Sequence, residues 1–468
     1  MPAKPRGYDM VAARPLRSTA WRVASRRMGI AASLATLAAA FVATFSFPAN
    51  AMKIQTVKSP GGIEAWLVEE HAVPMMAMRF AFDGGSSQDP AGKEGVANFV
   101  TAMLDEGAGD LVSRDFQERM EDLSMRMNYE EAKDAFYGNF ETLTANRDEA
   151  AKLLKLALTK PRFDQDAVER IRQQLLASLA YAARDPDKVA QNEWYAVAFA
   201  GHPYARPANG TEATVGKMTG ADLESYRKRV FAKDTLKVVA VGDITPEQLG
   251  KLLDEVFGAL PAKATLRPVA KTEAKASERL KVIDMNVPQS VARFGLPAMA
   301  RSDKDFMAAF VLNTILGGSA FTSRLYQEVR EKRGLAYGVD TSLVPMRHAS
   351  VFFGGVATKN EEVGQSLDVI RSELKRIVAE GPTEKELADI KAYLTGSFAL
   401  RFDTSTNIAN QLLWMLMEGL GHSYIQTRNA QIEAVTIDDV RRVAKRLFDG
   451  NELLVTVVGR PKGLGQGG

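Results

Sequence analysis

Arg330 and Tyr337 are the two residues of this 468-residue chain whose types and spacing could hold a carbonyl or carboxylate of a substrate. Arg330 carries a guanidinium and Tyr337 a phenol, and both groups donate hydrogen bonds. They lie in residues 317–337, GGSAFTSRLYQEVREKRGLAY, where Thr322 and Ser323 are N-cap types and Gly334 is a C-terminal stop. The stretch predicts a helix of about three turns followed by a strand, with Arg330 and Tyr337 converging on one surface. On spacing alone, a solvated arginine beside a half-buried strand tyrosine explains the pair at least as simply.

The helix predicted in this stretch has a buried side and a second, polar side. Leu325 and Val329 are four residues apart and form the buried stripe, while Tyr326 shares another face with Arg330. The whole stretch closely resembles the C-terminal half of pitrilysin/insulinase-type metallopeptidases, the inverzincins, which include the mitochondrial processing peptidase. The resemblance covers roughly residues 53–460. It implies that Arg330 and Tyr337 bind the main chain of a substrate next to a zinc site.

A zinc site of this family would begin on a helix that we expect at residues 95–104. In active members this helix carries H-x-x-E-H, in which two His bind zinc and the Glu is the general base. The matching residues here are Asn98, Thr101 and Ala102. A third ligand, a Glu on a later helix, is matched by Ser178. The resemblance therefore implies that all four positions are degenerate, that the chain has no catalytic or metal-binding residue and no cofactor of its own, and that it is closest to bacterial periplasmic subunits without the zinc motif.

Other residues offer little for a replacement metal site. The chain has no cysteine, which excludes thiolate ligands and disulfides. Its only histidines are His71, His202, His348 and His422, and no two of them lie within one helical turn. We therefore expect no alternative zinc site of the helical type.

The N-terminal 51 residues have the pattern of an export signal. Seven basic residues precede an uncharged apolar run at Met28–Phe47, and Ala49-Asn50-Ala51 is an A-x-A cleavage site. We expect a signal peptide cleaved after Ala51 and a periplasmic protein, with an uncleaved membrane anchor as the alternative. The export route, general or twin-arginine, stays open.

The composition is that of an ordinary soluble protein, with 46% hydrophobic and 25% charged residues. Loss of the signal peptide would remove seven of the 60 basic and one of the 57 acidic residues, which leaves a net charge of about −3. This balance gives no indication of nucleic-acid binding.

An internal repeat sets the domain organisation. Residues 219–243 match residues 436–460 at a constant offset of 217, including Phe231 on Phe448 and Gly242 on Gly459. The chain is thus predicted to be α+β, with two homologous α/β-sandwich halves that have antiparallel-rich sheets and face each other as a clamshell. The expected divisions are 1–51 (signal peptide), 52–260 (N-terminal half), 261–278 (linker) and 279–468 (C-terminal half).

Two strands are expected within residues 125–144, and the resemblance implies that this region supplies the edge strand to which a peptide substrate adds by main-chain pairing. Tyr137 and Phe140 in this region fit a peptide-contacting role and a core role equally well.

Three functions remain open at this point. The first is a catalytically inert, substrate-binding subunit of a heterodimeric zinc peptidase, whose homologous partner carries the zinc and acts on peptides or unfolded polypeptide. The second is a non-enzymatic peptide-binding chamber or scaffold with the same fold. The third is an active protease with a different site. Retention of the stretch 317–337 beside loss of the zinc ligands favours the first hypothesis.

Overall fold

The computed structural model describes residues 52–275, 279–318, 321–462 and 464. The predicted signal peptide, residues 1–51, lies outside the described residues. Ile54–Gly468 form one compact unit, and the features below all belong to it. Within the part of the chain that is described, no helix is long and apolar enough to span a bilayer.

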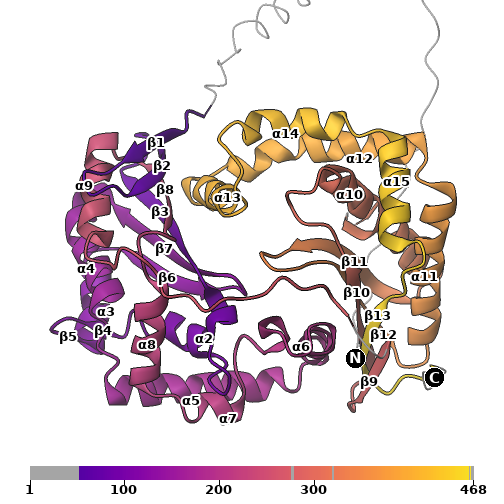
Figure 1. The fold of residues 1–468 in the computed structure, drawn as a ribbon, viewed down its shortest axis with the longest axis horizontal. Coiled ribbons are helices and arrows are strands. Elements are labelled where there is room, and N and C mark those ends of the chain that lie inside the picture. The colour runs from indigo at the N-terminus through magenta and orange to yellow at the C-terminus, as the bar shows by residue number, and fades with distance from the viewer. Residues whose placement is uncertain (1–51, 276–278, 319–320, 463, 465–468) are drawn as a thin grey trace, which may run out of the picture. The chain divides into compact units, whose positions relative to one another are not determined.

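A six-stranded sheet with the order β1-β2-β8-β3-β7-β6 forms the base of the N-terminal half (Figure 1). Its strands are β1 (Gln55–Lys58), β2 (Glu64–Glu69), β3 (Met75–Asp83), β6 (Arg126–Glu131), β7 (Ala135–Leu143) and β8 (Lys237–Gly242). Neighbours are antiparallel except β2 and β8, which run parallel. Among the described strands β6 pairs with β7 alone, so β6 is an edge strand, and its residues alternate between core and solvent.

The C-terminal half has a five-stranded sheet with the order β11-β12-β10-β13-β9. Its strands are β9 (Leu280–Asp284), β10 (Gln289–Pro297), β11 (Ala336–Pro345), β12 (Ser350–Lys359) and β13 (Leu454–Gly459). This order matches β6-β7-β3-β8-β2 of the first sheet strand by strand, including one parallel pair, β13 with β9. The predicted fold class, two α/β halves with antiparallel-rich sheets, is confirmed.

The sequence repeat at an offset of 217 residues corresponds to a repeat of secondary-structure elements. Helices α8 (Gly220–Val230) and α15 (Ile437–Phe448) begin 217 residues apart, and so do β8 and β13. Each helix is preceded by a threonine, Thr219 or Thr436, that forms a capping box with an aspartate three residues later. The same local signal therefore starts the same helix in both halves.

Helices cover one face of each sheet and enclose a hydrophobic core in each half. In the N-terminal half these are α2 (Val96–Thr101), α3 (Ser113–Asp122), α4 (Arg147–Thr159), α5 (Gln165–Ala182), α8 and α9 (Pro246–Phe257), with the short α7 (Glu212–Val215) and the small hairpin β4 (Gly107–Ala108) and β5 (Leu111–Val112) at the periphery. In the C-terminal half they are α10 (Phe306–Asn313), α11 (Val363–Glu380), α12 (Glu384–Gly396), α14 (Tyr424–Glu433) and α15. Phe140 is fully buried in the first core, so the core interpretation holds for this residue.

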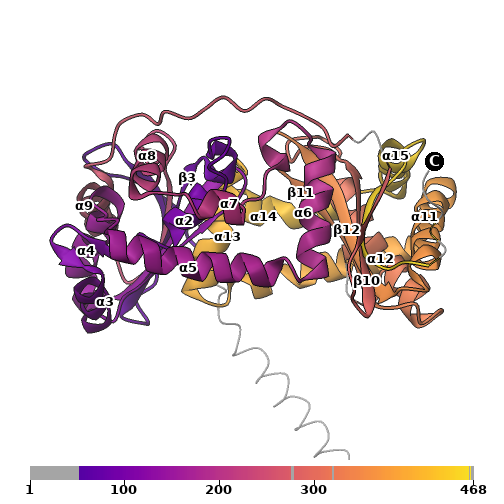
Figure 2. The same cartoon turned by 90° about the horizontal axis from the view of Figure 1, so that it is seen from below.

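Each half also contributes one helix to the sheet of the other half. Helix α6 (Pro186–Ala198) packs against β10 and β13, and both views place it beside that sheet (Figures 1 and 2). The indole N–H of the fully buried Trp194 donates to the carbonyl oxygen of Leu454 at 3.0 Å. A Cβ at Gly295 would lie 2.5 Å from the Trp194 ring, so the close approach of helix to sheet requires glycine there.

The reciprocal helix is α13 (Ser405–Met417), which packs against β3 and β8 of the first sheet. Arg79 on β3 joins the two, because its Nε donates to Asn410 Oδ1 of α13 at 2.8 Å. Its guanidinium also donates to Glu141, which in turn accepts from the Thr406 hydroxyl at 2.9 Å. The two halves are therefore bound to each other through exchanged helices as well as through the linker.

The linker itself is held by backbone hydrogen bonds although it has no regular secondary structure over residues 261–275. The N–H of Thr272 donates to His348 O, and that of Lys275 to Ala198 O, both at 2.8 Å. The remaining linker residues, 276–278, lie outside the described residues. The boundaries assigned to the four divisions stay predictions.

Candidate functional site

Helix α2 carries three of the four positions at which active relatives are expected to have zinc chemistry. The helix is shorter than the predicted 95–104. It ends at Thr101, because the N–H groups of Ala102 and Met103 donate to carbonyls only three residues back, at 3.1 Å each. Ala102 therefore lies at the end of the helix and presents a methyl group that cannot bind a metal.

The polar side chains of α2 make contacts within the protein. The Asn98 amide donates to Oε2 of Glu131, at the end of the edge strand β6, over 3.4 Å. The Thr101 hydroxyl donates to the backbone oxygen of Asn98 at 2.6 Å. Burial raises the pKa of Glu131, and the bond from Asn98 opposes that rise. An amide and a hydroxyl thus stand where a zinc site needs imidazole and carboxylate groups.

Ser178, the fourth position, lies exposed on helix α5. Helix α5 does pack against α2, since the guanidinium of Arg172 lies 5.8 Å from the centre of the Phe99 ring. Over the described ranges, no group of three or more His, Asp or Glu side chains is arranged to hold a metal ion. The four degenerate positions therefore bring together no ligand set.

A buried aspartate that is not among the residues predicted from the sequence holds the start of α2. Asp89 is 2% exposed, and its carboxylate accepts hydrogen bonds from the N–H groups of Gly95 (2.8 Å) and Ala97 (3.2 Å). Burial raises its pKa to about 7, although these two N–H groups and Arg206 lower it. Asp89 lies six residues before Gly95, outside the usual capping spacing, so no local sequence pattern indicates this role.

The second candidate region, residues 321–337, forms a wider helix than predicted. Tyr326–Glu331 is a π-helix, in which the N–H of Lys332 donates to the oxygen of Gln327 five residues back, at 3.0 Å. Gly334 ends it with a φ of +63°, as its stop signal predicts. Of the two N-cap candidates, Ser323 forms no side-chain cap, because its buried hydroxyl has no hydrogen-bond partner among the described residues. The backbone oxygen of Ser323 instead accepts from the N–H of Gln327 at 3.0 Å.

Arg330 and Tyr337 meet, as their spacing predicts. The guanidinium carbon of Arg330 lies 4.5 Å from the centre of the Tyr337 ring, which is a cation–π contact. Tyr337 is the second residue of β11 and is 84% exposed. The interpretation of Tyr337 as a half-buried strand residue is therefore wrong, and a large phenol ring stands in solvent beside a cation.

Two further aromatic residues complete this surface. The guanidinium of Arg330 donates to the hydroxyl of the buried Tyr326 and lies 5.0 Å from the centre of that ring. Phe321 is 69% exposed and packs edge-on against Tyr326, with ring centres 5.6 Å apart. The four-residue spacing of Tyr326 and Arg330 was the sequence signal for this contact. We call Phe321, Tyr326, Arg330 and Tyr337 the Arg330 surface.

The Arg330 surface suits an extended peptide. Guanidinium has five N–H donors, and a phenol adds one. The partners of Arg330 among the described residues are the Tyr326 hydroxyl and Glu331, whose Oε1 lies 3.8 Å from its Nε. Donors therefore remain for a carbonyl or carboxylate of a bound chain, and the exposed rings of Phe321 and Tyr337 offer apolar area next to them.

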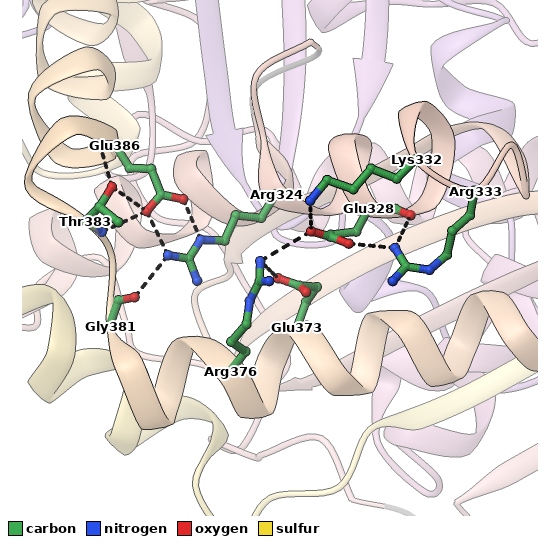
Figure 3. A network of polar contacts seen from close by, with 9 residues as sticks. All are labelled: Arg324, Glu328, Lys332, Arg333, Glu373, Arg376, Gly381, Thr383 and Glu386. Carbon is green, nitrogen blue, oxygen red and sulfur yellow. Dashed lines mark hydrogen bonds and ion pairs between the residues drawn. The ribbon is translucent and has the colours of Figure 1, made fainter.

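Other charged residues of the same stretch are used inside the protein (Figure 3). Glu328 is 5% exposed and binds Lys332 and Arg333, both at 2.6 Å, with Arg376 of α11 at 3.5 Å. These cations, Lys332 first, lower the pKa of Glu328 to about 2. Three basic side chains thus fix the helix that carries Arg330.

A second ion pair ties the beginning of the stretch to helix α12. Arg324 makes a two-pronged contact with Glu386, at 2.6 and 2.7 Å, and donates to Gly381 O at 3.0 Å. Glu386 also completes the capping box of Thr383 at the start of α12. Much of the motif is consequently explained by intramolecular contacts, and Arg330 and Tyr337 stand outside this network.

A cavity of about 650 Å³ lies between the exposed face of β6 and β7 and helix α13. Alternate residues of β6 and β7 form its floor, and helix α13 contributes the opposite side: Arg126, Asn128, Glu130, Tyr137, Asn139 and Glu141 on the strands, and Thr406, Asn410, Leu413 and Trp414 on the helix. Tyr137 thus lines this cavity and is not part of the core. Both signs of charge are present, which suits the alternating donors and acceptors of a polypeptide backbone better than a single ionic group.

Two family descriptions match consecutive parts of the chain. Residues 66–212 match "Insulinase (Peptidase family M16)" and residues 217–394 match "Peptidase M16 inactive domain". Together they cover more than half of the sequence, so the chain belongs to the M16 family, the pitrilysin/insulinase-type peptidases.

Several relatives align with more than four fifths of the chain. The "Non-peptidase homolog YmxG" of Helicobacter pylori is 30% identical over 396 residues, which are 84% of this chain and 91% of the relative. The "Probable mitochondrial-processing peptidase subunit beta" of Schizosaccharomyces pombe is 24% identical over 82% of this chain and 86% of its own. The crystal structure of a peptidase M16 inactive domain from Pseudomonas fluorescens superimposes with a TM-score of 0.82 at 28% identity, covering 88% of this chain and 98% of that one.

These likenesses agree with the degenerate residues on α2 and α5. A relative named as a non-peptidase and a structural neighbour described as an inactive domain both align with almost all of this chain. The expectation of no zinc cofactor in this chain agrees with the names of these two relatives.

Proposed function

We propose that this chain is a catalytically inert, peptide-binding subunit that works with a homologous, zinc-containing M16 peptidase. The observation that carries the proposal is the Arg330 surface. It exposes a guanidinium and a phenol that the neighbouring ion network does not use. A protein that only needed this stretch for packing would have no use for a tyrosine that is 84% exposed.

The cavity beside β6 supports the same proposal. An edge strand offers unpaired N–H and C=O groups to which an extended peptide can add as a further strand. The solvent-facing side chains of β6 line a cavity of about 650 Å³, which has room for several peptide residues. A peptide bound beside β6 and at the Arg330 surface would be positioned for hydrolysis by the partner, and no catalytic group of this chain would be needed.

A mixed complex with the partner peptidase tests the proposal. Arg330→Gln removes a charged donor and lowers kcat/KM of the complex about tenfold or more, and Tyr337→Phe lowers it about fivefold. The effect falls mainly on kcat if the contacts tighten in the transition state, and on KM if they only bind the peptide. The double variant loses less than the sum, because both groups contact the same stretch of substrate.

Lys385→Gln is the matched control, because it removes one positive charge from the same half outside both the Arg330 surface and the ion network of Glu328. It leaves kcat/KM within about twofold, since its ion pair with Asp389 is exposed on both sides. Full activity of the complex with both Arg330 and Tyr337 replaced would refute the proposed role.

A peptide-binding chamber or scaffold without a peptidase partner is the second candidate. Its support is the ion network of Figure 3, which accounts for Arg324, Glu328, Lys332 and Arg333 without a substrate. Under this function the purified chain binds peptides, yet no M16 peptidase copurifies with it at native expression levels. A stable complex with such a peptidase decides in favour of the first candidate.

The proposal includes export to the periplasm. Its support is the basic region, the apolar run and the A-x-A site in residues 1–51. N-terminal sequencing of the mature protein from a periplasmic fraction should begin at Met52. An intact N-terminus in the membrane fraction would favour the anchor instead.

A further inference from the structure

A second cavity, of about 360 Å³, lies in the C-terminal half among α10, β11, α12, α13 and α14. Its walls include aromatic residues, among them Phe310, Phe398 and Tyr424. No part of the proposed peptidase partnership requires this cavity. Trp414 lines both this cavity and the one beside β6, so the two cavities adjoin the same side chain.

The charge in this second cavity has one sign. Arg301, Arg401 and Arg428 line it, and its described lining contains no Asp or Glu. Across the described ranges none of the three takes part in an ion pair, although Glu418, outside the lining, acts on Arg301 through space. Three guanidinium groups that form no ion pair among the described residues offer N–H donors and positive charge to an anion.

Two of these arginines are held in place by aromatic rings. Arg428 is 4% exposed, with its guanidinium 4.2 Å from the centre of the Phe398 ring and one N–H donated to Leu394 O at 3.0 Å. Arg301 lies 4.5 Å from the centre of the Phe306 ring, and its buried Nε has no hydrogen-bond partner among the described residues. Burial lowers the pKa of Arg428, Tyr424 opposes this effect, and the charges of Arg401 and Arg301 lower the pKa further.

A buried acceptor also lines the cavity. Asn313 is 7% exposed, and its Nδ2 donates to Thr341 O at 3.2 Å, which orients the amide. Its Oδ1 has no hydrogen-bond partner among the described residues. A buried acceptor without a partner costs free energy that a ligand N–H would recover. A ligand that complements this cavity therefore has a negative charge, an N–H donor and an apolar group in one molecule.

We propose that this cavity binds the C-terminal residue of an acylated amino acid or peptide that ends in a large apolar side chain. The carboxylate pairs with the arginines, the amide N–H donates to Asn313 Oδ1, and the side chain occupies the aromatic walls. In its peptide form the inference deepens the peptide-binding function proposed above, and Trp414 is the side chain at which a peptide beside β6 would turn into the cavity.

Calorimetric titration of the mature full chain with N-acetyl-L-phenylalanine tests the cavity without a partner or a peptide. We expect one saturable site per chain. N-acetyl-phenylalaninamide, which lacks the carboxylate, should bind at least about thirtyfold more weakly, and 3-phenylpropanoate, which lacks the N–H, about five- to tenfold more weakly. Equal binding of acid and amide would overturn the inference.

The variant Arg301→Gln/Arg401→Gln removes two charges that are not fully buried and should weaken binding of the acid at least tenfold, with little effect on the amide. The matched control, Arg371→Gln/Arg441→Gln, removes two exposed charges of the same half outside the cavity lining and should leave binding unchanged. Loss of affinity in both pairs, or in neither, contradicts the assignment.

A second arm separates the two sources of this chemistry. A nine-residue peptide that ends in a free phenylalanine is compared with its C-terminal amide. Tighter binding of the free-acid peptide supports recognition of peptide ends. Binding of N-acetyl-L-phenylalanine without binding of the peptide supports a small acylated amino acid as the ligand, and it leaves the test of Arg330 and Tyr337 in the mixed complex unaffected.

Discussion

Helix α2 of the N-terminal half and the Tyr326–Glu331 π-helix of the C-terminal half are each held by a buried carboxylate, but in opposite electrostatic surroundings. Asp89 accepts two backbone N–H groups at the start of α2, and its pKa is raised to about 7 by burial. Glu328 is surrounded by Lys332, Arg333 and Arg376, and its pKa is lowered to about 2.

The two helices are held in place by different kinds of contact. Helix α2 keeps its place through backbone contacts that involve neither Asn98 nor Thr101, so loss of the metal ligands does not require loss of the helix. The Tyr326–Glu331 π-helix is held by ion pairs between side chains, and neither Arg330 nor Tyr337 takes part in those ion pairs. Helix α2 therefore keeps its position without zinc ligands, whereas the π-helix region keeps Arg330 and Tyr337 as groups that can donate hydrogen bonds to a ligand.

The largest expected effect is the return of a metal site to α2 and α5. Unmodified protein should retain no stoichiometric zinc after dialysis, because an amide, a hydroxyl, a methyl group and Ser178 offer no suitable ligands. The variant Asn98→His/Thr101→Glu/Ala102→His/Ser178→Glu should retain one equivalent by metal analysis. Ser178 is exposed, so a glutamate there is not buried without a partner.

The triple variant that keeps Ser178 is the control, and it should bind zinc markedly more weakly because it has one ligand fewer. Peptidase activity does not have to return, since the groups that orient the ligands are not restored. A folded quadruple variant without zinc would show that the register assigned to α2 and α5 is wrong.

Asp89→Asn should change the pH dependence of stability. The folded pKa of about 7 lies above the unfolded value of 3.8, so the protonated carboxyl stabilises the fold fully below about pH 4 and this contribution is lost as the pH rises to 7. Asparagine does not ionise, so the variant should gain relative to the parent across this window by up to about 4 kcal/mol. Urea unfolding at pH 4.5 and pH 8 measures the difference, and a parallel pH dependence of the two proteins would contradict the buried-carboxyl assignment.

Glu328→Gln should show the opposite sign. The folded pKa of about 2 lies below the unfolded value of 4.5, so the ionised carboxylate stabilises the fold above pH 4.5 and the contribution is lost as the pH falls toward 2. The variant should be less stable than the parent by up to about 3 kcal/mol at pH 7, with the gap closing in acid. A gap that stays constant with pH would mean that packing, and not charge, explains Glu328.

The smallest effect concerns the two tyrosines at Arg330. Tyr337→Phe should change the free energy of unfolding by less than about 0.5 kcal/mol, because the hydroxyl stands in solvent. Tyr326→Phe should cost about 1 kcal/mol, because it removes the buried acceptor of the Arg330 guanidinium. If Tyr337→Phe were the costlier of the two in urea unfolding, Tyr337 would be a packing residue and the contrast between the two regions would fail.

The sequence by itself determined the features that depend on local contacts or on repetition. The capping boxes at Thr219 and Thr436 act over three residues, so they can be predicted without a fold. The offset of 217 residues predicted two halves of one design, and the matching strand orders confirm it. The contact of Arg330 with Tyr337 followed from a helix, a glycine stop and a strand that are consecutive in the chain.

Tertiary structure decided what depends on residues far apart in sequence. The exchange of α6 and α13 joins Trp194 to Leu454 across 260 positions, and no periodicity within either helix specifies which sheet it covers. The hydrogen bonds between Asp89 and the start of α2 depend on the path of a loop, and the ion pair of Glu328 with Arg376 depends on the position of α11. Burial removes water from these groups and thereby sets their pairing and their pKa, and burial is a property of the assembled fold.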